Sequence, residues 1–359
     1  MKINRLEITN FRNLQQVAIE LGPRINLFYG ENGSGKTSLL EVLHYLGIGR
    51  SFRTRNIARL IHHGAEGFSI FTQLTQPCGA TLPVGVERSK DNSASAIRIG
   101  GQAASSLVEI ASILPLQFIN ADSHLLLNSG PLTRRQFLDW GVFHVEPSFF
   151  TYWQRSTRIL RQRNASLKIS TSYSDLSAWD EELIISADWL DMRRRAYLAD
   201  LEPVLYPLLS ALLPDVNLHL HYFPGWSSQR SLQDALCHSF LRDKQAGYTH
   251  QGPHRADLQI KLDTVNAADL LSHGQQKLVA YALKLAQGLL LHSQRNKQCV
   301  YLIDDLPSEL DKSKRKLVTD IINSMEAQIF ITGIEIDSFA DLAPSPEAKM
   351  FHVEHGNIR

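Results

Sequence analysis

Hydrophobic positions in the first hundred residues predict several strands around one helix. Residues 6–11 alternate between apolar and polar side chains, and residues 24–29 are mostly apolar, so both segments are predicted to be strands. Residues 37–46 carry apolar side chains at helical spacing. A tight turn is expected at Gly100-Gly101. Three further segments, bounded by Gly, Asn and Ser, are predicted to be antiparallel strands: 68–75, 81–88 and 96–99.

The middle of the chain has a different pattern. From residue 132 to about residue 213 strand signals fade and helical spacing dominates, with helices expected at 134–142, 149–170 and 176–201. Strand and turn signals return from Pro214 and at 222–226. One more helix, 272–291, and three late strands, 299–303, 328–332 and 350–353, are expected. The pattern predicts an α/β chain whose head, residues 1–120 plus 235–359, is split by a mainly helical insertion at 121–234.

Composition narrows the class of protein. The 359 residues are 43% hydrophobic and 20% charged, which is typical of an ordered globular protein. The net charge is only +1, so contacts with nucleic acid must come from local patches. Cys78, Cys237 and Cys299 lack ligand-like spacing, and a reducing, cytoplasmic location is expected. The charged start does not fit a signal peptide, and the apolar stretch 204–213 is too short to span a bilayer.

A phosphate-binding loop follows the second predicted strand. Its glycines allow successive backbone N–H groups to point at phosphate oxygens, and the helix that follows adds its positive N-terminal dipole. Lys36 is expected to reach the β- and γ-phosphates as a catalytic residue, and the Thr37 hydroxyl to bind Mg²⁺. The sequence lacks an Asn-Lys-x-Asp guanine motif, which favours ATP over GTP. The nucleotide-binding residues are Gly30, Glu31, Asn32, Gly33, Ser34, Gly35, Lys36 and Thr37, which fit G-x-x-x-x-G-K-[ST], followed by Ser38.

A pair of carboxylates ends a late apolar strand. Asp304 and Asp305 follow residues 299–303, and the carboxyl ends of parallel strands are where such sheets bind ligands. Asp304 is expected to hold Mg²⁺, and Asp305 to orient or deprotonate the attacking water. Taken alone, the pair is equally well explained as a solvated helix cap. Together with the phosphate loop, it favours a catalytic magnesium–nucleotide site.

Two further runs complete an ordered set of motifs. Residues 271–276 resemble the L-S-G-G-Q signature of ABC-type ATPases through Ser272, Gly274 and Gln275, although a capped helix also explains the run alone. Residues 308–311, ending in Asp311, resemble the D-loop. The order of the four motifs resembles the ABC/SMC class, which implies an ABC/SMC-like ATPase head. It also implies an ATP-dependent homodimer in which each signature contacts ATP held by the other subunit.

The chain also resembles the RecF family of bacterial recombination-repair ATPases over nearly its whole length. The resemblance implies ATP-dependent binding to duplex, gapped or junction DNA in repair and replication-fork maintenance. It implies dimerisation on DNA driven by ATP, release by slow hydrolysis, and action with RecO and RecR in loading RecA. The matching runs are residues 6–13, 30–37 with Glu41, 51–54, 130–139, 161–164, 252–257 and 271–277.

The sequence departs from ABC proteins at three places. Gln117 is the nearest candidate for the glutamine of the Q-loop. Residues 332–335, Thr-Gly-Ile-Glu, stand where ABC proteins have a switch histidine. Asp305 replaces the usual glutamate, and its shorter reach predicts slow hydrolysis.

Arginine residues of the insertion are candidate DNA contacts. Between residues 131 and 168 the basic residues outnumber the acidic ones by seven to two, and such a surface binds DNA without sequence preference and with strong salt dependence. A solvated charged face explains the arginines equally well, as it does the second cluster, 193–195. Trp153 could stack on bases or belong to the core. His254 and Arg255 fit a catalytic role, a domain-locking role or a structural ion pair. The candidate contacts are Arg134, Arg135, Arg155, Arg158 and Arg161.

Two other functions compete with DNA repair. The soluble ATPase subunit of an ABC transporter would share all four motifs, but it does not account for the arginine-rich helical insertion. A metabolic P-loop kinase would leave residues 271–276 and 308–311 unexplained.

Overall fold

The computed structural model describes residues 1–91, 95–306, 312–339 and 348–359. The chain forms two compact units, Met1–Ser123 with Leu291–Arg359, and His124–Leu290. The first boundary lies near the expected residue 121, but the chain returns to the first unit at residue 291 and not at 235. The difference arises because the strand signal near residue 222 belongs to a small sheet inside the second unit. Within the described ranges, no helix is both long and apolar enough to cross a bilayer.

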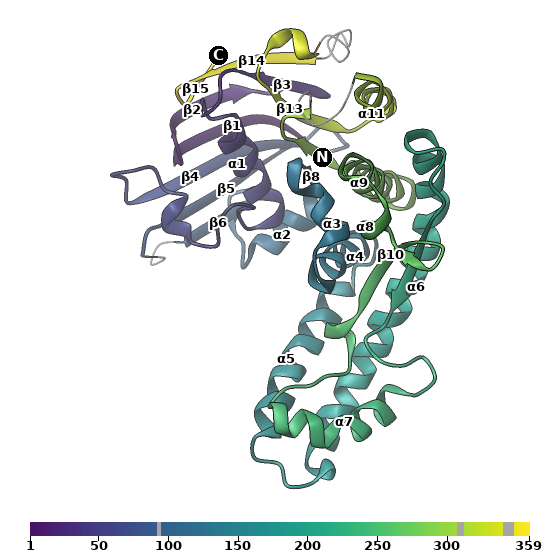
Figure 1. Ribbon diagram of the computed structural model, residues 1–359. Coiled ribbons are helices and arrows are strands. Elements are labelled where there is room, and N and C mark those ends of the chain that lie inside the picture. The colour runs from purple at the N-terminus through teal and green to yellow at the C-terminus, as the bar shows by residue number, and fades with distance from the viewer. Residues whose placement is uncertain (92–94, 307–311, 340–347) are drawn as a thin grey trace. The chain divides into compact units, whose positions relative to one another are not determined.

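The first unit contains two six-stranded sheets (Figure 1). The antiparallel sheet has the order β2-β1-β4-β5-β6-β7, and the other has the order β15-β14-β3-β13-β12-β8, parallel except for β15. The antiparallel sheet comprises β1 (Lys2–Phe11), β2 (Leu14–Glu20), β4 (Gly67–Thr75), β5 (Thr81–Ser89), β6 (Ser95–Ile99) and β7 (Gln102–Ala103). The other comprises β3 (Ile25–Tyr29), β8 (Leu116–Ile119), β12 (Val300–Ile303), β13 (Gln328–Gly333), β14 (Ala348–Glu354) and β15 (Asn357–Ile358).

Helix α1 (Lys36–Ile48) lies between these two sheets. It contacts β1 of the antiparallel sheet and β8, β12 and β13 of the parallel one. Its residues are therefore buried on nearly all sides, from Lys36 to Gly47 with Thr37 as the exception. Leu39, Leu43 and Leu46 join a hydrophobic core cluster that includes residues of both sheets. The remaining described helices of the unit are η1 (Ile57–Arg59), α2 (Leu107–Ile113), α11 (Lys312–Ser324) and η5 (Ile336–Phe339), with η2 (Ala121–His124) at the boundary.

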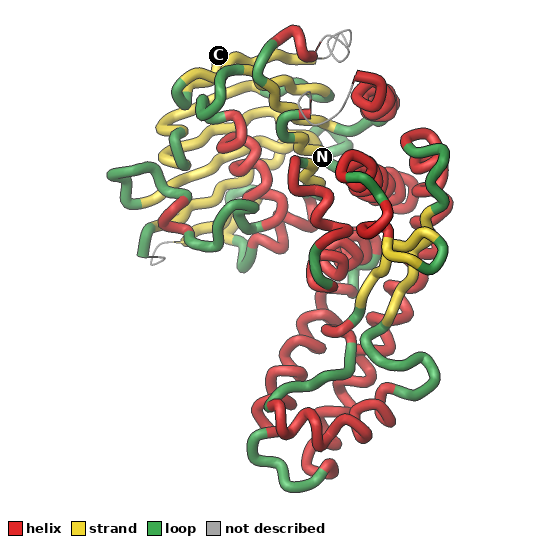
Figure 2. The backbone as a smooth tube through the Cα atoms, viewed as in Figure 1, coloured by secondary structure: helices red, strands yellow, loops and turns green. Residues whose placement is uncertain are grey.

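The second unit is mainly helical (Figure 2). Side chains of α5, α6 and α7 pack into one cluster that includes Ile159, Leu183 and Leu236, one from each helix. A three-stranded antiparallel sheet has the order β11-β10-β9. The helices are α3 (Leu125–Asn128), α4 (Pro131–Val145), α5 (Phe149–Leu167), η3 (Tyr173–Leu176), α6 (Ser177–Leu212), α7 (Leu232–Ala246), η4 (Pro253–Arg255), α8 (Ala267–Leu270) and α9 (His273–Arg295), whose last residues belong to the first unit. The strands are β9 (Leu218–Phe223), β10 (Asp257–Leu262) and β11 (Val265–Asn266).

The elements confirm the expected α/β class with a mainly helical second part. Helix α6 runs 36 residues to Leu212, well beyond the expected end at 201, and it continues through Pro203 and Pro207. Proline lacks an N–H donor and normally interrupts a helix, so the sequence alone favoured an earlier end. The turn at Gly100-Gly101 joins β6 to β7, as expected.

Candidate functional site

The phosphate-loop motif connects β3 to α1, and its lysine side chain forms hydrogen bonds with the backbone of the same loop. The Lys36 ammonium donates hydrogen bonds to the carbonyl oxygens of Gly30 at 2.6 Å and Glu31 at 2.8 Å. Gly30 has φ 153°, and a Cβ added there would lie 2.1 Å from the carbonyl oxygen of Val353 in β14. The loop therefore needs glycine at this position, because strand β14 leaves no room for a side chain.

The two halves of the expected nucleotide site meet in the first unit. The Thr37 hydroxyl lies 3.3 Å from Oδ1 of Asp304, although 267 residues separate them in the sequence. The Thr332 hydroxyl donates to the same oxygen at 2.7 Å. Burial raises the pKa of Asp304, while the hydrogen bonds from Thr332 and Thr37 oppose the shift. Burial also lowers the pKa of Lys36, against the attraction of Asp305 and Asp304.

A pocket of about 750 Å³ lies over these residues. The lining residues expected from the sequence are Asn32, Gly33, Gly35, Lys36, Thr37, Ser38, Asp304 and Asp305. The others were not expected and are Asn13, Phe52, Arg53, Asn120, Ala121, Asp122, Thr332 and Ile334. Gly30, Glu31 and Ser34 shape the loop behind the pocket, where the Ser34 carbonyl accepts hydrogen bonds from Asn13 Nδ2 and the Gly356 N–H. The pocket is therefore lined by polar groups from six separate stretches of the chain.

A buried glutamate explains how Arg53 reaches this pocket. Glu41 of α1 is fully buried and accepts two hydrogen bonds from Arg12, at 2.9 and 3.0 Å. Its carboxylate also accepts a hydrogen bond from the Ser51 hydroxyl. The oxygen of that hydroxyl in turn accepts hydrogen bonds from the backbone N–H groups of Arg53 and Thr54. The loop after α1 is thus fixed to the helix, with the Arg53 side chain 44% exposed beside the pocket. Arg12 lies in the matching run at 6–13, and Ser51, Arg53 and Thr54 lie in the run at 51–54. The sequence therefore marked these residues but did not show that they contact one another.

Gln117, the nearest candidate for the Q-loop glutamine, is not among the residues that line the pocket. Gln117 is the second residue of β8, where it pairs with Tyr301 and is 7% exposed. The pocket wall begins after the strand ends, at Asn120. Gln117 is thus held within the sheet, and its assignment to the Q-loop stays a prediction.

The donor groups at the site fit a magnesium ion. Mg²⁺ prefers oxygen ligands and binds through one or two protein groups together with substrate phosphates. The Thr37 hydroxyl and the Asp304 carboxylate supply such oxygens 3.3 Å apart in the same pocket. In the part of the chain that the structure describes, no cluster of three or more His, Cys, Asp or Glu side chains offers a site for a transition metal. Asp311 and the rest of the expected D-loop lie outside the described residues.

The signature-like run opens α9 in the second unit. The Ser272 hydroxyl accepts the N–H of Gln275, and Gln275 Oε1 accepts the N–H of Ser272, which together form a capping box. Gln276 is buried and bonds the carbonyl oxygens of Leu271 and Ala268. Gly274 is exposed, and a Cβ added there would meet nothing within 4 Å. The helix start is thus rigid and offers an uncrowded backbone surface.

The five arginines that we selected as candidate DNA contacts differ in their surroundings. Arg134 forms a two-point ion pair with Asp257, at 2.8 and 3.0 Å, and Arg135 donates to the Ala256 carbonyl. Both therefore hold α4 against the start of β10. Arg155 on α5 pairs with Glu182 at 3.2 Å, whereas Arg158 and Arg161 are exposed. The second cluster is mixed: Arg193 and Arg195 are paired with Glu146 and Asp191, and Arg194 is buried in a two-point pair with Asp139.

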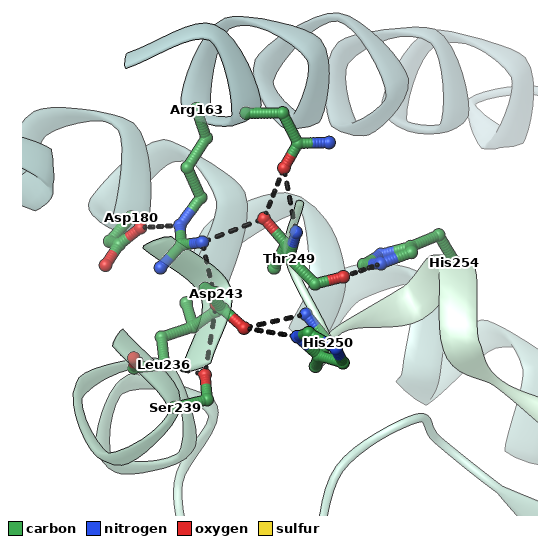
Figure 3. A network of polar contacts seen from close by, with 9 residues as sticks. Arg163, Asp180, Leu236, Ser239, Asp243, Thr249, His250 and His254 are labelled. Carbon is green, nitrogen blue, oxygen red and sulfur yellow. Dashed lines mark hydrogen bonds and ion pairs between the residues drawn. The ribbon is translucent and has the colours of Figure 1, made fainter. Parts of the chain in front are cut away.

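A buried ion network joins α5, α6 and α7 of the second unit (Figure 3). Arg163 is fully buried and contacts Asp180 at 2.5 Å, Asp243 at 3.0 Å and the Thr249 hydroxyl. His254 lies at the edge of the network and donates to the Thr249 carbonyl at 2.9 Å. Arg163 of the 161–164 run and His254 of the 252–257 run thus form contacts inside the second unit, whereas Arg161 is exposed.

The comparisons with known proteins agree over the full length. Residues 2–358 match the family model described as RecF/RecN/SMC N terminal domain. The chain is 45% identical to the DNA replication and repair protein RecF of Pseudomonas paraeruginosa, covering 100% of this chain and 97% of the relative. It is 43% identical to the RecF of Psychromonas ingrahamii, over 100% and 99%.

Solved structures share the fold. The recombination mediator protein RecF bound to ATP, of the RecFOR pathway, matches with a TM-score of 0.87 and 24% identity, over 99% of this chain and 98% of that one. An SMC head bound to the C-terminal winged-helix domain of ScpA matches with a TM-score of 0.63 and 16% identity, over 100% and 96%. With nearly full-length relatives above 40% identity and a family model that spans almost every residue, the chain belongs to the RecF family.

Proposed function

We propose that the protein is an ATP-dependent DNA-binding ATPase of DNA replication and repair. The observation that carries the proposal is the contact between Thr37 and Asp304, which unites the phosphate loop with the carboxylate pair. In the proposed reaction, backbone N–H groups of the loop and Lys36 bind the phosphates, and Thr37 and Asp304 hold Mg²⁺. The metal supplies charge neutralisation at the β- and γ-phosphates when it is bound. Asp305 orients the attacking water, and Arg53, beside the same pocket, adds positive charge near the phosphates.

ATP is proposed to act as a switch for a homodimer. The exposed, rigid start of α9 around Ser272 and Gly274 suits contact with ATP held by a second copy. Binding would close the dimer, and hydrolysis would open it, so affinity for ATP and dimerisation are linked. Asp305 has a shorter side chain than glutamate, which supports slow hydrolysis. Lys36→Arg is expected to keep the fold but weaken ATP-driven dimerisation. If ATP does not change the sedimentation of the wild-type protein, the proposed switch is contradicted.

DNA is proposed to bind along α5, with Arg158 and Arg161 as phosphate contacts. Both side chains are exposed and lie on one flank of the helix with Arg155. We infer a cytoplasmic protein that works with RecO and RecR and helps to load RecA at gaps, as the RecFOR description of the structural relative suggests. The transporter alternative is not favoured, because the named repair proteins match both units of this chain.

Salt-dependent binding to duplex DNA tests the proposal. Association should be stronger with ATP, and log K should fall linearly with log salt concentration. Replacing both Arg158 and Arg161 by Gln should reduce that slope by about two, one for each lost phosphate contact. Arg195→Gln is the matched control, because Arg195 is a partly exposed arginine on a different helix, paired with Asp191. Equal slopes for the double variant and the control would exclude α5, and DNA binding that ignores ATP would refute the proposed function.

A further inference from the structure

Thr332 lies at the centre of the carboxylate pair, although the proposed reaction gives it no role. It is the fifth residue of β13 and is fully buried. Strand β13 is the parallel neighbour of β12, with Ile303 paired to Ile331. Thr332 therefore lies beside Asp304, where β12 ends.

One hydroxyl connects the two acidic residues. Thr332 Oγ1 donates to Asp304 Oδ1 at 2.7 Å and accepts the backbone N–H of Asp305 at 2.8 Å. The hydroxyl thus acts as a donor to Asp304 and as an acceptor for Asp305, the next residue. Since Thr37 contacts the same oxygen of Asp304, two hydroxyls restrain the rotation of that carboxylate.

The backbone at Asp305 makes the second bond important. Asp305 has φ 54°, in the left-handed region that non-glycine residues adopt infrequently. The N–H bond to Thr332 fixes the peptide plane that precedes this turn. It therefore sets the direction in which the Asp305 side chain leaves the chain toward the pocket.

We propose that Thr332 is a positioning residue that holds Asp304 for metal binding and Asp305 for orienting water. This inference rests on the proposed function, since it presumes that nucleotide and Mg²⁺ bind in this pocket. Packing in β13 would be served equally by valine, which has the same branched shape. The role assigned here belongs to the hydroxyl alone, and partners that orient a metal ligand typically change metal affinity by about 10- to 100-fold when they are removed.

The test compares Thr332→Val, Thr332→Ser and a control, Thr72→Val, in the full-length protein. Thr72 is also a buried strand threonine of the first unit, and its hydroxyl donates to the Arg5 carbonyl. The readouts are thermal unfolding, binding of a fluorescent ATP analogue in EDTA, and the affinity for Mn²⁺ by electron paramagnetic resonance with a non-hydrolysable ATP analogue. Thr332→Val should weaken Mn²⁺ binding about 10- to 100-fold and leave nucleotide affinity in EDTA within about twofold. Thr332→Ser and Thr72→Val should bind Mn²⁺ like the wild type.

Two outcomes would overturn the inference in distinguishable ways. If the wild type binds Mn²⁺ with nucleotide and Thr332→Val binds it equally well, Thr332 has no positioning role, while the proposed function stands. If the wild type binds no nucleotide or Mn²⁺, the proposed function fails and the inference fails with it. Should Thr332→Val not fold, Thr332→Ala removes the same hydroxyl without adding a methyl group, and wild-type Mn²⁺ affinity in that variant would equally refute the role.

Discussion

The ionisation of His254 makes the stability of the second unit depend on pH. Its Nε2 lies 2.9 Å from the Thr249 carbonyl oxygen, which can only accept, so that nitrogen carries a proton in the neutral ring. Burial lowers the pKa of His254 from 6.5 to about 4, and the nearby Arg255 and Arg135 add to the shift, while the Thr249 bond and Asp243 oppose it. Between these two pKa values the unfolded chain binds a proton that the folded chain does not. Acidification from pH 6.5 toward pH 4 therefore favours unfolding. The lost stability is fully regained once the pH lies above 6.5.

The size of the effect follows from the two pKa values. Moving from pH 7.5 to pH 5.5 should cost the folded state about 1.3 kcal/mol through this histidine, with a limit on the order of 3 kcal/mol below pH 4. His254→Gln keeps an amide N–H for the Thr249 carbonyl but has no ionisable ring. The difference in unfolding free energy between wild type and variant should therefore change by about 1.3 kcal/mol over this interval.

Urea unfolding followed by tryptophan fluorescence measures this difference. All five tryptophans, at 140, 153, 179, 189 and 226, lie in the second unit, so their signal reports that unit alone. Subtracting the variant removes the contribution of every other titrating group. Parallel pH dependences for wild type and His254→Gln would show that the histidine is not held neutral and would refute the reasoning.

Three further predictions concern other parts of the protein. Arg163→Met removes the positive charge between Asp180 and Asp243, although Asp243 keeps its hydrogen bonds from His250 and Ser239, and should cost about 3–5 kcal/mol in the same urea assay; a loss below 1 kcal/mol would contradict the network. Ser272→Arg should abolish ATP-driven dimerisation in sedimentation and leave nucleotide binding by the monomer intact; loss of monomer binding would show that the helix start acts on its own chain's ATP. Gly30→Ala should destabilise the first unit by about 2 kcal/mol or more and abolish binding of a fluorescent ATP analogue, because its Cβ would meet a strand carbonyl; wild-type affinity would contradict the close approach.

The phosphate loop could be predicted because the residues that bind phosphate and the glycines that shape the loop all lie within one short run of the sequence. The contact between Thr37 and Asp304 could also be predicted, since parallel strands present their carboxyl ends at one edge. The same rule locates the pocket wall after β8, which continues for two residues beyond Gln117 before the wall begins at Asn120. Placing the end of that strand correctly would have identified the wall residue.

Long-range ion pairs could not be predicted from the sequence. Arg134 and Asp257 are 123 residues apart, and no local pattern marks an arginine that is used within the fold rather than at its surface. The same applies to Arg194, which reads as part of an exposed basic cluster but is buried against Asp139. Charge counting therefore overestimated the free basic surface, whereas Arg158 and Arg161 kept the exposure that helical spacing implied.

The order of the strands in the parallel sheet constrains folding during synthesis. Strand β3 lies between β13 and β14, so its two neighbours emerge some three hundred residues after it. At about 5–20 residues per second, the ribosome needs roughly 15–60 s to supply them. Residues 124–290 are complete before that time, so the helical unit can form while the nucleotide-binding unit still waits for its last strands. A nascent chain stalled near residue 290 would carry the whole phosphate loop and yet be unable to bind a nucleotide.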